Sequence, residues 1–195
     1  MANTAKFNRQ HVIENACQLF WLKGYSSTST RDLQRAVDMR PGSIYAAFGS
    51  KQGLYVESLK FYSRSMATQL KQCIVDSATI LEGMQAFVTK ILIDDEQAQA
   101  SKVCMLIKSN IELCESEPEL LKLSQELLTQ FERMIEDLFT QAQSKSELPS
   151  KQSPLDLARM FLIQFTGLRS YLKWNDDKTL SSQLIEQMFQ QIKSV

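Results

Sequence analysis

Residues 9–55 read RQHVIENACQLFWLKGYSSTSTRDLQRAVDMRPGSIYAAFGSKQGLY, and this stretch decides the fold. Apolar side chains recur at the spacing of one helix face, which predicts a first helix over about residues 8–23 that Gly24 ends. The hydroxyl cluster of residues 26–30 offers caps for a short second helix. Pro41 suits the first position of a third helix, and Ser50 can cap a long fourth one.

Two short helices joined by a turn of about three residues, with another helix bracing them, form the helix-turn-helix plan. Asp38 tolerates left-handed geometry in the turn, and Met39 offers an apolar plug beside it. The inward residues are Leu33, Val37, Ile44 and Phe48. The outward face is short, small and almost free of acidic residues, as expected for a helix that enters a groove about 12 Å wide. The alternative from these residues alone is an ordinary three-helix core.

The remainder of the chain also has helical periodicity and shows no sustained alternation of the kind that strands require. The predicted helices beyond the fourth cover about residues 79–97, 101–115, 117–144, 154–175 and 179–194. We therefore predict an all-α fold of about nine helices, with an N-terminal helix-turn-helix domain over residues 1–53 and a second helical domain over residues 54–195.

The composition bounds the possible functions. The 195 residues include 22 basic and 22 acidic side chains, but the first 60 residues carry eight basic and four acidic ones. This basic head suits a polyanion, although chance could also produce it. Apolar runs are far shorter than the roughly 20 residues of a membrane span, and no signal peptide is evident, so we expect no membrane partner and a cytoplasmic location.

Catalytic chemistry has little support in this sequence. The single histidine is His11, and the four cysteines lack the spacing of a zinc or redox pair. The glycine-rich and HExxH motifs of nucleotide and zinc enzymes are missing as well. We expect neither an enzyme nor a metal or cofactor. A thiol enzyme using Cys104 or Cys114, and a helical scaffold that binds only proteins, are the alternatives from other functional classes.

The strings ENACQLFWLKGYSSTSTRDL (residues 14–33) and GSIYAAFGSKQGLY (residues 42–55) resemble the N-terminal domain of the tetracycline-repressor (TetR/AcrR) family of bacterial transcription regulators. Three positions depart from the family pattern, which usually has Ala at Gln34, Gly at Asp38, and Ser or Thr at Arg40. The first two departures suggest altered packing of the second helix and turn. The third removes the usual cap of the recognition helix and offers a base-reading side chain instead.

The resemblance implies a dimeric repressor that binds a palindromic double-stranded DNA operator, associates with the nucleoid when bound, and is released by a small-molecule effector. The DNA contacts that it implies are Thr30, Arg31, Arg40, Pro41, Gly42, Ser43, Tyr45, Ala46, Ala47 and Lys51. The chemistry agrees, because Arg40 can donate two parallel hydrogen bonds to guanine and Lys51 adds charge beside helix N-terminal amides. The resemblance covers little more than the first third of the chain.

Two further groups of residues follow from the family's body domain. An apolar effector pocket, or alternatively a filled core, involves Tyr62, Met66, Met84, Phe87, Val88, Ile91, Cys104, Met105, Phe131 and Met134. A dimer face, or again a core, involves Leu157, Phe161, Phe165, Leu168, Leu172, Leu184 and Met188. Some related regulators sense oxidants or electrophiles with a cysteine near position 104. Here Cys104 is either such a thiol or a small buried hydrophobe.

Overall fold

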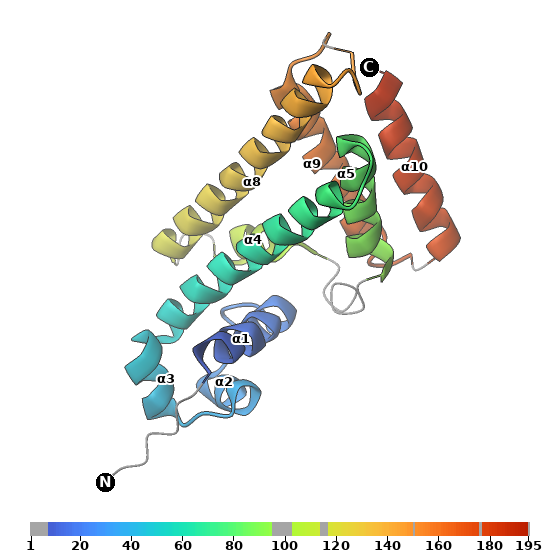
Figure 1. Ribbon diagram of the computed structural model, residues 1–195. Helices are drawn as coiled ribbons and strands as arrows, with labels where there is room; N and C mark the ends of the chain where they lie inside the picture. The colour runs from blue at the N-terminus through green and yellow to red at the C-terminus, as the bar shows by residue number, and fades with distance from the viewer. Residues whose placement is uncertain (1–7, 95–102, 114–116, 150, 176, 195) are drawn as a thin grey trace. The chain divides into compact units, whose positions relative to one another are not determined.

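The computed structural model describes residues 8–94, 103–113, 117–149, 151–175 and 177–194 (Figure 1). Within these ranges the chain forms nine α-helices, one π-helical segment and no strand, which confirms the predicted all-α class. The elements in chain order are α1 (Arg9–Lys23), α2 (Thr30–Val37), α3 (Pro41–Phe48), α4 (Lys51–Val75), α5 (Ile80–Thr89), η1 (Lys90–Asp94), α7 (Met105–Leu113), α8 (Pro118–Ser144), α9 (Pro154–Tyr171) and α10 (Lys178–Ser194). Cys114 lies outside the described residues.

Side-chain caps set the beginnings of the first two helices. The Asn8 carboxamide oxygen accepts hydrogen bonds from the backbone N–H of Gln10 and His11 at the start of α1. At the start of α2, Ser29 and Asp32 exchange side-chain and backbone hydrogen bonds in a capping box. Lys23 contacts the Asp32 carboxylate at 2.8 Å, and this contact together with the Ser29 hydrogen bonds holds the pKa of Asp32 well below its usual range.

Two of the predicted helices differ from the observed ones at their C-terminal ends. The helix expected over residues 79–97 stays α-helical only to Thr89 and continues as the π-helical segment η1. The helix expected over residues 154–175 ends at Tyr171. There the backbone N–H of Lys173 and of Trp174 each bonds a carbonyl three residues back, at 3.3 Å, and the chain leaves the helix in tight turns.

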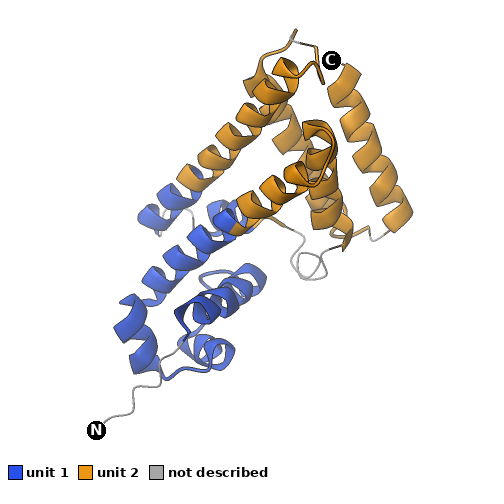
Figure 2. Ribbon diagram, in the orientation of Figure 1, with its two compact units in different colours: residues 1–64, 105–125 blue, residues 65–104, 126–195 orange. Residues whose placement is uncertain are grey.

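The described chain divides into two compact units (Figure 2). Unit 1 contains residues 1–64 and 105–125, and unit 2 contains residues 65–104 and 126–195. Unit 1 thus holds α1, α2, α3, the first half of α4, all of α7 and the start of α8. The predicted domain boundary between residues 53 and 54 falls within α4 and stays a prediction.

The core of unit 2 is a cluster of phenylalanine rings from α5, α8, α9 and α10. Phe161 lies at its centre, with ring centroids 5.9 Å from Phe165, 6.2 Å from Phe139 and 6.2 Å from Phe189. Phe87 of α5 also packs against Phe165, at 5.9 Å. These rings are at most 4% exposed, so the cluster closes the interior of unit 2.

Close backbone contacts and a distant cap fix α5 within unit 2. The Glu147 carboxylate accepts hydrogen bonds from the backbone N–H of Ile80 and Leu81, each at 3.1 Å, at the helix N-terminus. Gly83 lies so near α4 that a Cβ there would be 2.6 Å from the Cα of Ile74. Across the described ranges, no helix combines the length and the apolar character needed to span a bilayer.

Candidate nucleic-acid interface

Helices α2 and α3 meet through a turn whose backbone geometry is specific. Asp38 ends α2 in the left-handed region, with φ 49° and ψ 46°, where aspartate is one of the few tolerated non-glycine residues. Arg40 then precedes α3 in an extended conformation, and Pro41 occupies the first helical position. The Arg40 side chain forms no cap hydrogen bond with α3, so its guanidinium is not used to close the helix end.

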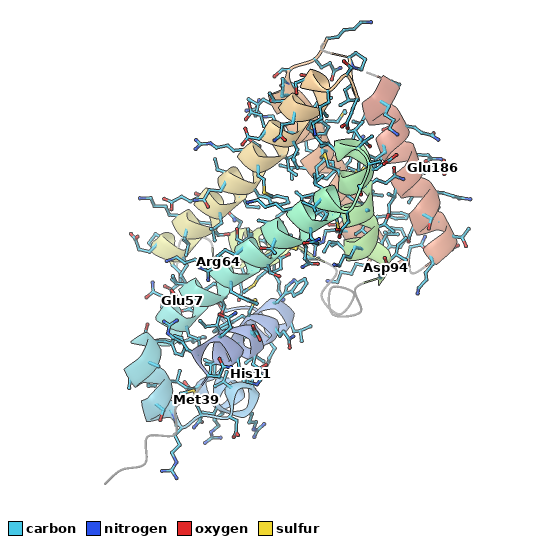
Figure 3. The ribbon with its side chains drawn as sticks, in the orientation of Figure 1. His11, Met39, Glu57, Arg64, Asp94 and Glu186 are labelled. Atoms are coloured by element: carbon cyan, nitrogen blue, oxygen red, sulfur yellow. The ribbon has the colours of Figure 1, made fainter. Side chains whose placement is uncertain are left out.

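Buried side chains and one arginine hold α3 in place. Leu33 and Val37 of α2 and Ile44 and Phe48 of α3 are all at most 8% exposed. Arg9 of α1 lies over the Phe48 ring, 4.7 Å from its centroid. Its guanidinium also contacts the Glu57 carboxylate of α4 at 3.3 Å, where Figure 3 labels Glu57. The orientation of α3 is therefore set from three other helices of unit 1.

The outward face of the motif carries the residues predicted to contact DNA. The exposed ones are Arg31, Arg40, Gly42, Ser43, Tyr45 and Ala46, and the half-buried ones are Thr30, Pro41, Ala47 and Lys51. Helix α3 contains no acidic residue. The face therefore offers hydrogen-bond donors and small apolar groups around a short protruding helix.

Some of the predicted contact residues are brought together across the motif. The Thr30 hydroxyl at the start of α2 lies 3.2 Å from the Tyr45 hydroxyl of α3, within hydrogen-bond distance. Either oxygen can donate in this pair, which leaves the other group free to donate outward. Thr30 and Tyr45 therefore form one polar patch that bridges the two helices.

Lys51, at the first position of α4, rests on an aromatic ring that the sequence does not single out. Its ammonium lies 4.4 Å from the centroid of Tyr25, in a cation–π contact. Partial burial lowers the pKa of Lys51, against the opposing influence of the Glu112 and Glu117 carboxylates. The sequence signal that could have indicated Tyr25 is its place directly after Gly24, within the string of residues 14–33 that resembles the family.

The predicted pocket residues are distributed over both units. In unit 2, Met66, Met84, Phe87, Val88 and Ile91 are buried, whereas Cys104, Phe131 and Met134 are half-buried. In unit 1, Tyr62 packs on Trp21 with ring centroids 5.2 Å apart, and the Met105 sulfur lies 3.8 Å from the Cys17 sulfur. Among the described residues, no cluster of three or more histidine, cysteine or acidic side chains could hold a metal ion.

The predicted dimer residues separate into two sets within unit 2. Leu157, Phe161, Phe165, Leu172 and Met188 are at most 4% exposed and belong mainly to the core of their own chain. Leu168 and Leu184 are half-buried and line an open groove of about 350 Å³ between α9 and α10. The groove residues are Gln164, Gly167, Leu168, Tyr171, Leu180, Leu184, Gln187, Met188 and Gln191.

The comparisons with known proteins agree with this geometry. The family model described as bacterial regulatory proteins, tetR family, matches residues 12–57, which contain α2, α3 and most of α1. The HTH-type transcriptional repressor ComR of Escherichia coli is 23% identical over 163 residues, which cover 83% of this chain and 78% of ComR.

Two solved structures share the fold along nearly the whole chain. A TetR-family regulator from Cytophaga hutchinsonii superposes with a TM-score of 0.83 at 19% identity and covers 96% of this chain and 94% of its own. A cysteine mutant of the TetR-family regulator CifR, complexed with 26-bp double-strand operator DNA, superposes with a TM-score of 0.85 at 18% identity. The match covers 97% of this chain and 98% of the CifR chain. The family model therefore matches the part of the chain that holds the helix-turn-helix motif of α2 and α3, and the solved structures show that the chain has the fold of TetR-family regulators along nearly its whole length.

Proposed function

We propose that this protein is a transcriptional regulator of the TetR family, a homodimeric repressor that binds a palindromic DNA operator through α3 and leaves it when a small apolar ligand binds. The observation that carries the proposal is the outward face of α3, which is exposed, free of acids and surrounded by donors. A helix of this kind fits the major groove, where base edges present a distinct pattern for each base pair.

The donors around α3 divide into base readers and phosphate binders. Arg40 is exposed at the N-terminal end of α3 and makes no cap hydrogen bond with it, so its guanidinium can face a guanine edge. Lys51 lies at the N-terminus of α4, where the positive end of the helix dipole favours a phosphate. The paired hydroxyls of Thr30 and Tyr45 supply a further polar contact to the DNA backbone.

Gly42 provides an independent argument. It occupies the second position of α3 with ordinary helical geometry, and a Cβ built there meets no atom within 4 Å. The fold itself therefore does not require glycine at this position, although glycine destabilises a helix relative to alanine. Close approach of the α3 backbone to DNA explains the missing side chain.

The same reasoning supports dimerisation through α9 and α10. Gly167 of α9 also has no atom within 4 Å of a built Cβ, and it lines the groove with Leu168 and Leu184. Ile163, one turn earlier, is 72% exposed. A second copy of this chain would cover these apolar groups in an intermolecular helix bundle and would place two α3 helices on a palindromic site.

The effector site is proposed for the apolar residues of unit 2. Met84, Phe87 and Val88 have no exposed surface, so a ligand would enter by displacing side chains rather than by filling an open cleft. The flexible methionines suit such repacking around apolar molecules. Release from DNA would occur in the cytoplasm, beside the chromosome.

A thiol signal is the second candidate, and the accessibility of Cys104 favours it. Cys104 carries a free, half-buried thiol directly before α7. Cys17, by contrast, is 4% exposed, and burial raises its pKa to about 12. Hydrogen peroxide should release the wild-type protein from its operator and leave Cys104→Ser bound. Equal release of both proteins would discard this candidate.

The decisive test of the proposed function is binding to the DNA upstream of the protein's own gene over a range of salt concentrations. The purified protein should retain a short near-palindrome at 0.15 M salt while competitor DNA is lost. For each phosphate contact, the affinity should fall by about 0.9 logarithmic units for every tenfold increase in salt concentration. Binding that is equal for all sequences would contradict an operator-specific repressor.

A further inference from the structure

Helix α7 grips the end of α1 and the turn that follows it through two oppositely charged side chains. The Lys108 ammonium donates hydrogen bonds to the carbonyl oxygens of Trp21 at 2.9 Å and Leu22 at 2.8 Å. The Glu112 carboxylate accepts hydrogen bonds from the backbone N–H of Tyr25 at 3.0 Å and Ser26 at 2.7 Å. All of these residues belong to unit 1.

The charges match the polarity of the backbone that they contact. Lys108 meets carbonyl groups at the negative C-terminal end of α1, whereas Glu112 meets N–H groups of the following turn. The two side chains are four residues apart, so they lie on one face of α7. We call Lys108 and Glu112 the α7 clamp.

Gly24 lies at the centre of the α7 clamp. Its φ of +87° is unfavourable for other residues, and a built Cβ would be 2.5 Å from the Glu112 carboxylate. The position must therefore remain glycine both for its backbone geometry and for the approach of Glu112. Ser109, between the two clamp residues, adds a hydrogen-bond contact of 2.7 Å with the Tyr55 hydroxyl of α4.

A chain of contacts through Tyr25 connects the α7 clamp to Lys51, which is one of the proposed DNA contacts. The backbone N–H of Tyr25 donates a hydrogen bond to Glu112, and the Tyr25 hydroxyl donates one to the Glu117 carboxylate. The Tyr25 ring lies 4.4 Å from the Lys51 ammonium and supports it. The Tyr25 ring also packs on Tyr55, with centroids 4.7 Å apart. Tyr25 is thus a platform for Lys51 whose position depends on α7.

We propose that Lys108 and Glu112 are positioning residues for DNA binding, which fix the turn after α1 and, through Tyr25, aim Lys51 at a phosphate. The inference rests on the proposed DNA-binding function and adds to it two residues that lie outside the helix-turn-helix motif. A lysine on a long flexible stem loses conformational entropy when it binds a phosphate, and a fixed platform reduces that loss.

Opposite charges make the test sharp. Glu112→Gln removes a negative charge and Lys108→Met removes a positive one, so a general electrostatic effect on DNA must shift the affinity in opposite directions. Loss of the α7 clamp must instead weaken binding in both variants. We expect both to bind the operator about eightfold more weakly at 0.1 M salt, with a salt slope reduced by about 0.9, as for Lys51→Ala.

Three further measurements separate positioning from general loosening of the fold. Lys108→Arg keeps two donors and should restore wild-type binding. The double variant Lys51→Ala/Glu112→Gln should bind no more weakly than Lys51→Ala alone, because both changes remove one contact. Hydrogen exchange at the amides of Tyr25 and Ser26 should accelerate in Glu112→Gln while the helical circular dichroism signal stays unchanged.

Opposite affinity shifts in the two charge variants would overturn the inference, as would full additivity with Lys51→Ala or binding equal to wild type. Each of these results would contradict the role of the α7 clamp but not the proposed function, because the wild-type protein would still bind its operator. A wild-type protein that binds no DNA would instead remove the proposed function and, with it, the role of the α7 clamp.

Discussion

Replacing Gly42 by alanine should stabilise the protein and weaken its binding to DNA. Apart from its sequence neighbours and the backbone of its own helix, the added methyl group meets no atom within 4 Å, and the position has ordinary helical geometry. Substitution of glycine by alanine at such a position stabilises a protein by about 0.4–1 kcal/mol, mainly by restricting the unfolded chain. For a chain of this size the thermal midpoint should rise by about 1–4 °C.

The same methyl group would occupy space that we assign to the DNA backbone. Forcing a methyl group into a well-packed contact costs about 1–3 kcal/mol. This range corresponds to a loss of affinity of about fivefold to 150-fold. The two effects have opposite signs, so a variant that merely misfolds cannot mimic the expected result.

Gly53→Ala is the matched control, because it makes the same chemical change in another helix of unit 1. A Cβ at Gly53 would collide with the carbonyl oxygen of Phe48, so this variant should melt at a lower temperature than wild type. Differential scanning calorimetry and fluorescence anisotropy with a labelled operator measure the two quantities. Unchanged affinity of Gly42→Ala would refute the close approach of α3 to DNA. A melting temperature of Gly42→Ala below that of wild type would refute the conclusion that the fold has room for a Cβ at this position.

Three further predictions concern base reading, dimerisation and pH. Arg40→Ala should relax the preference at one position of each half-site, whereas Lys51→Ala should weaken binding equally for all sequences; binding-site selection distinguishes the two. Leu168→Glu should produce monomers in sedimentation that no longer bind the operator, because it charges the groove between α9 and α10. The depressed pKa of Asp32 means that its ionised form stabilises the fold above about pH 4 and that this stabilisation is lost as the pH falls. Asp32→Asn should therefore melt below wild type at pH 7, and the difference should shrink under acid.

The elements that local chemistry determines could be predicted from the sequence. The capping box at Ser29 and the proline at the first position of α3 mark their helix ends by contacts within a few residues. The hydrogen bonds of Glu112 join residues 86 and 87 positions apart, and no short pattern announces them. From the sequence alone, a lysine and a glutamate four residues apart on a helix are typical of an ordinary surface pair. Only the folded structure shows that both contact the end of α1 and the turn that follows it.

Periodicity also could not separate a core from a contact surface. Phe161, Phe165 and Leu168 recur at helical spacing and are all apolar, so they share one face by sequence. The structure buries the two phenylalanines in their own unit and leaves Leu168 beside the groove. Phe161 and Leu168 are seven residues apart and therefore differ by only about 20° around the helix axis, so the outcome depends on which partners the other helices bring.

Unit 1 is assembled from two segments of the chain, with residues 65–104 between them assigned to unit 2. During synthesis, residues 1–64 therefore leave the ribosome without Lys108, Ser109 and Glu112. The 49 residues from 65 to the end of α7 at Leu113 take about 2–10 s to add at typical elongation rates. Throughout that interval the turn after α1 lacks the hydrogen bonds that α7 provides, so a nascent or truncated chain would present α3 before Lys51 has its final support.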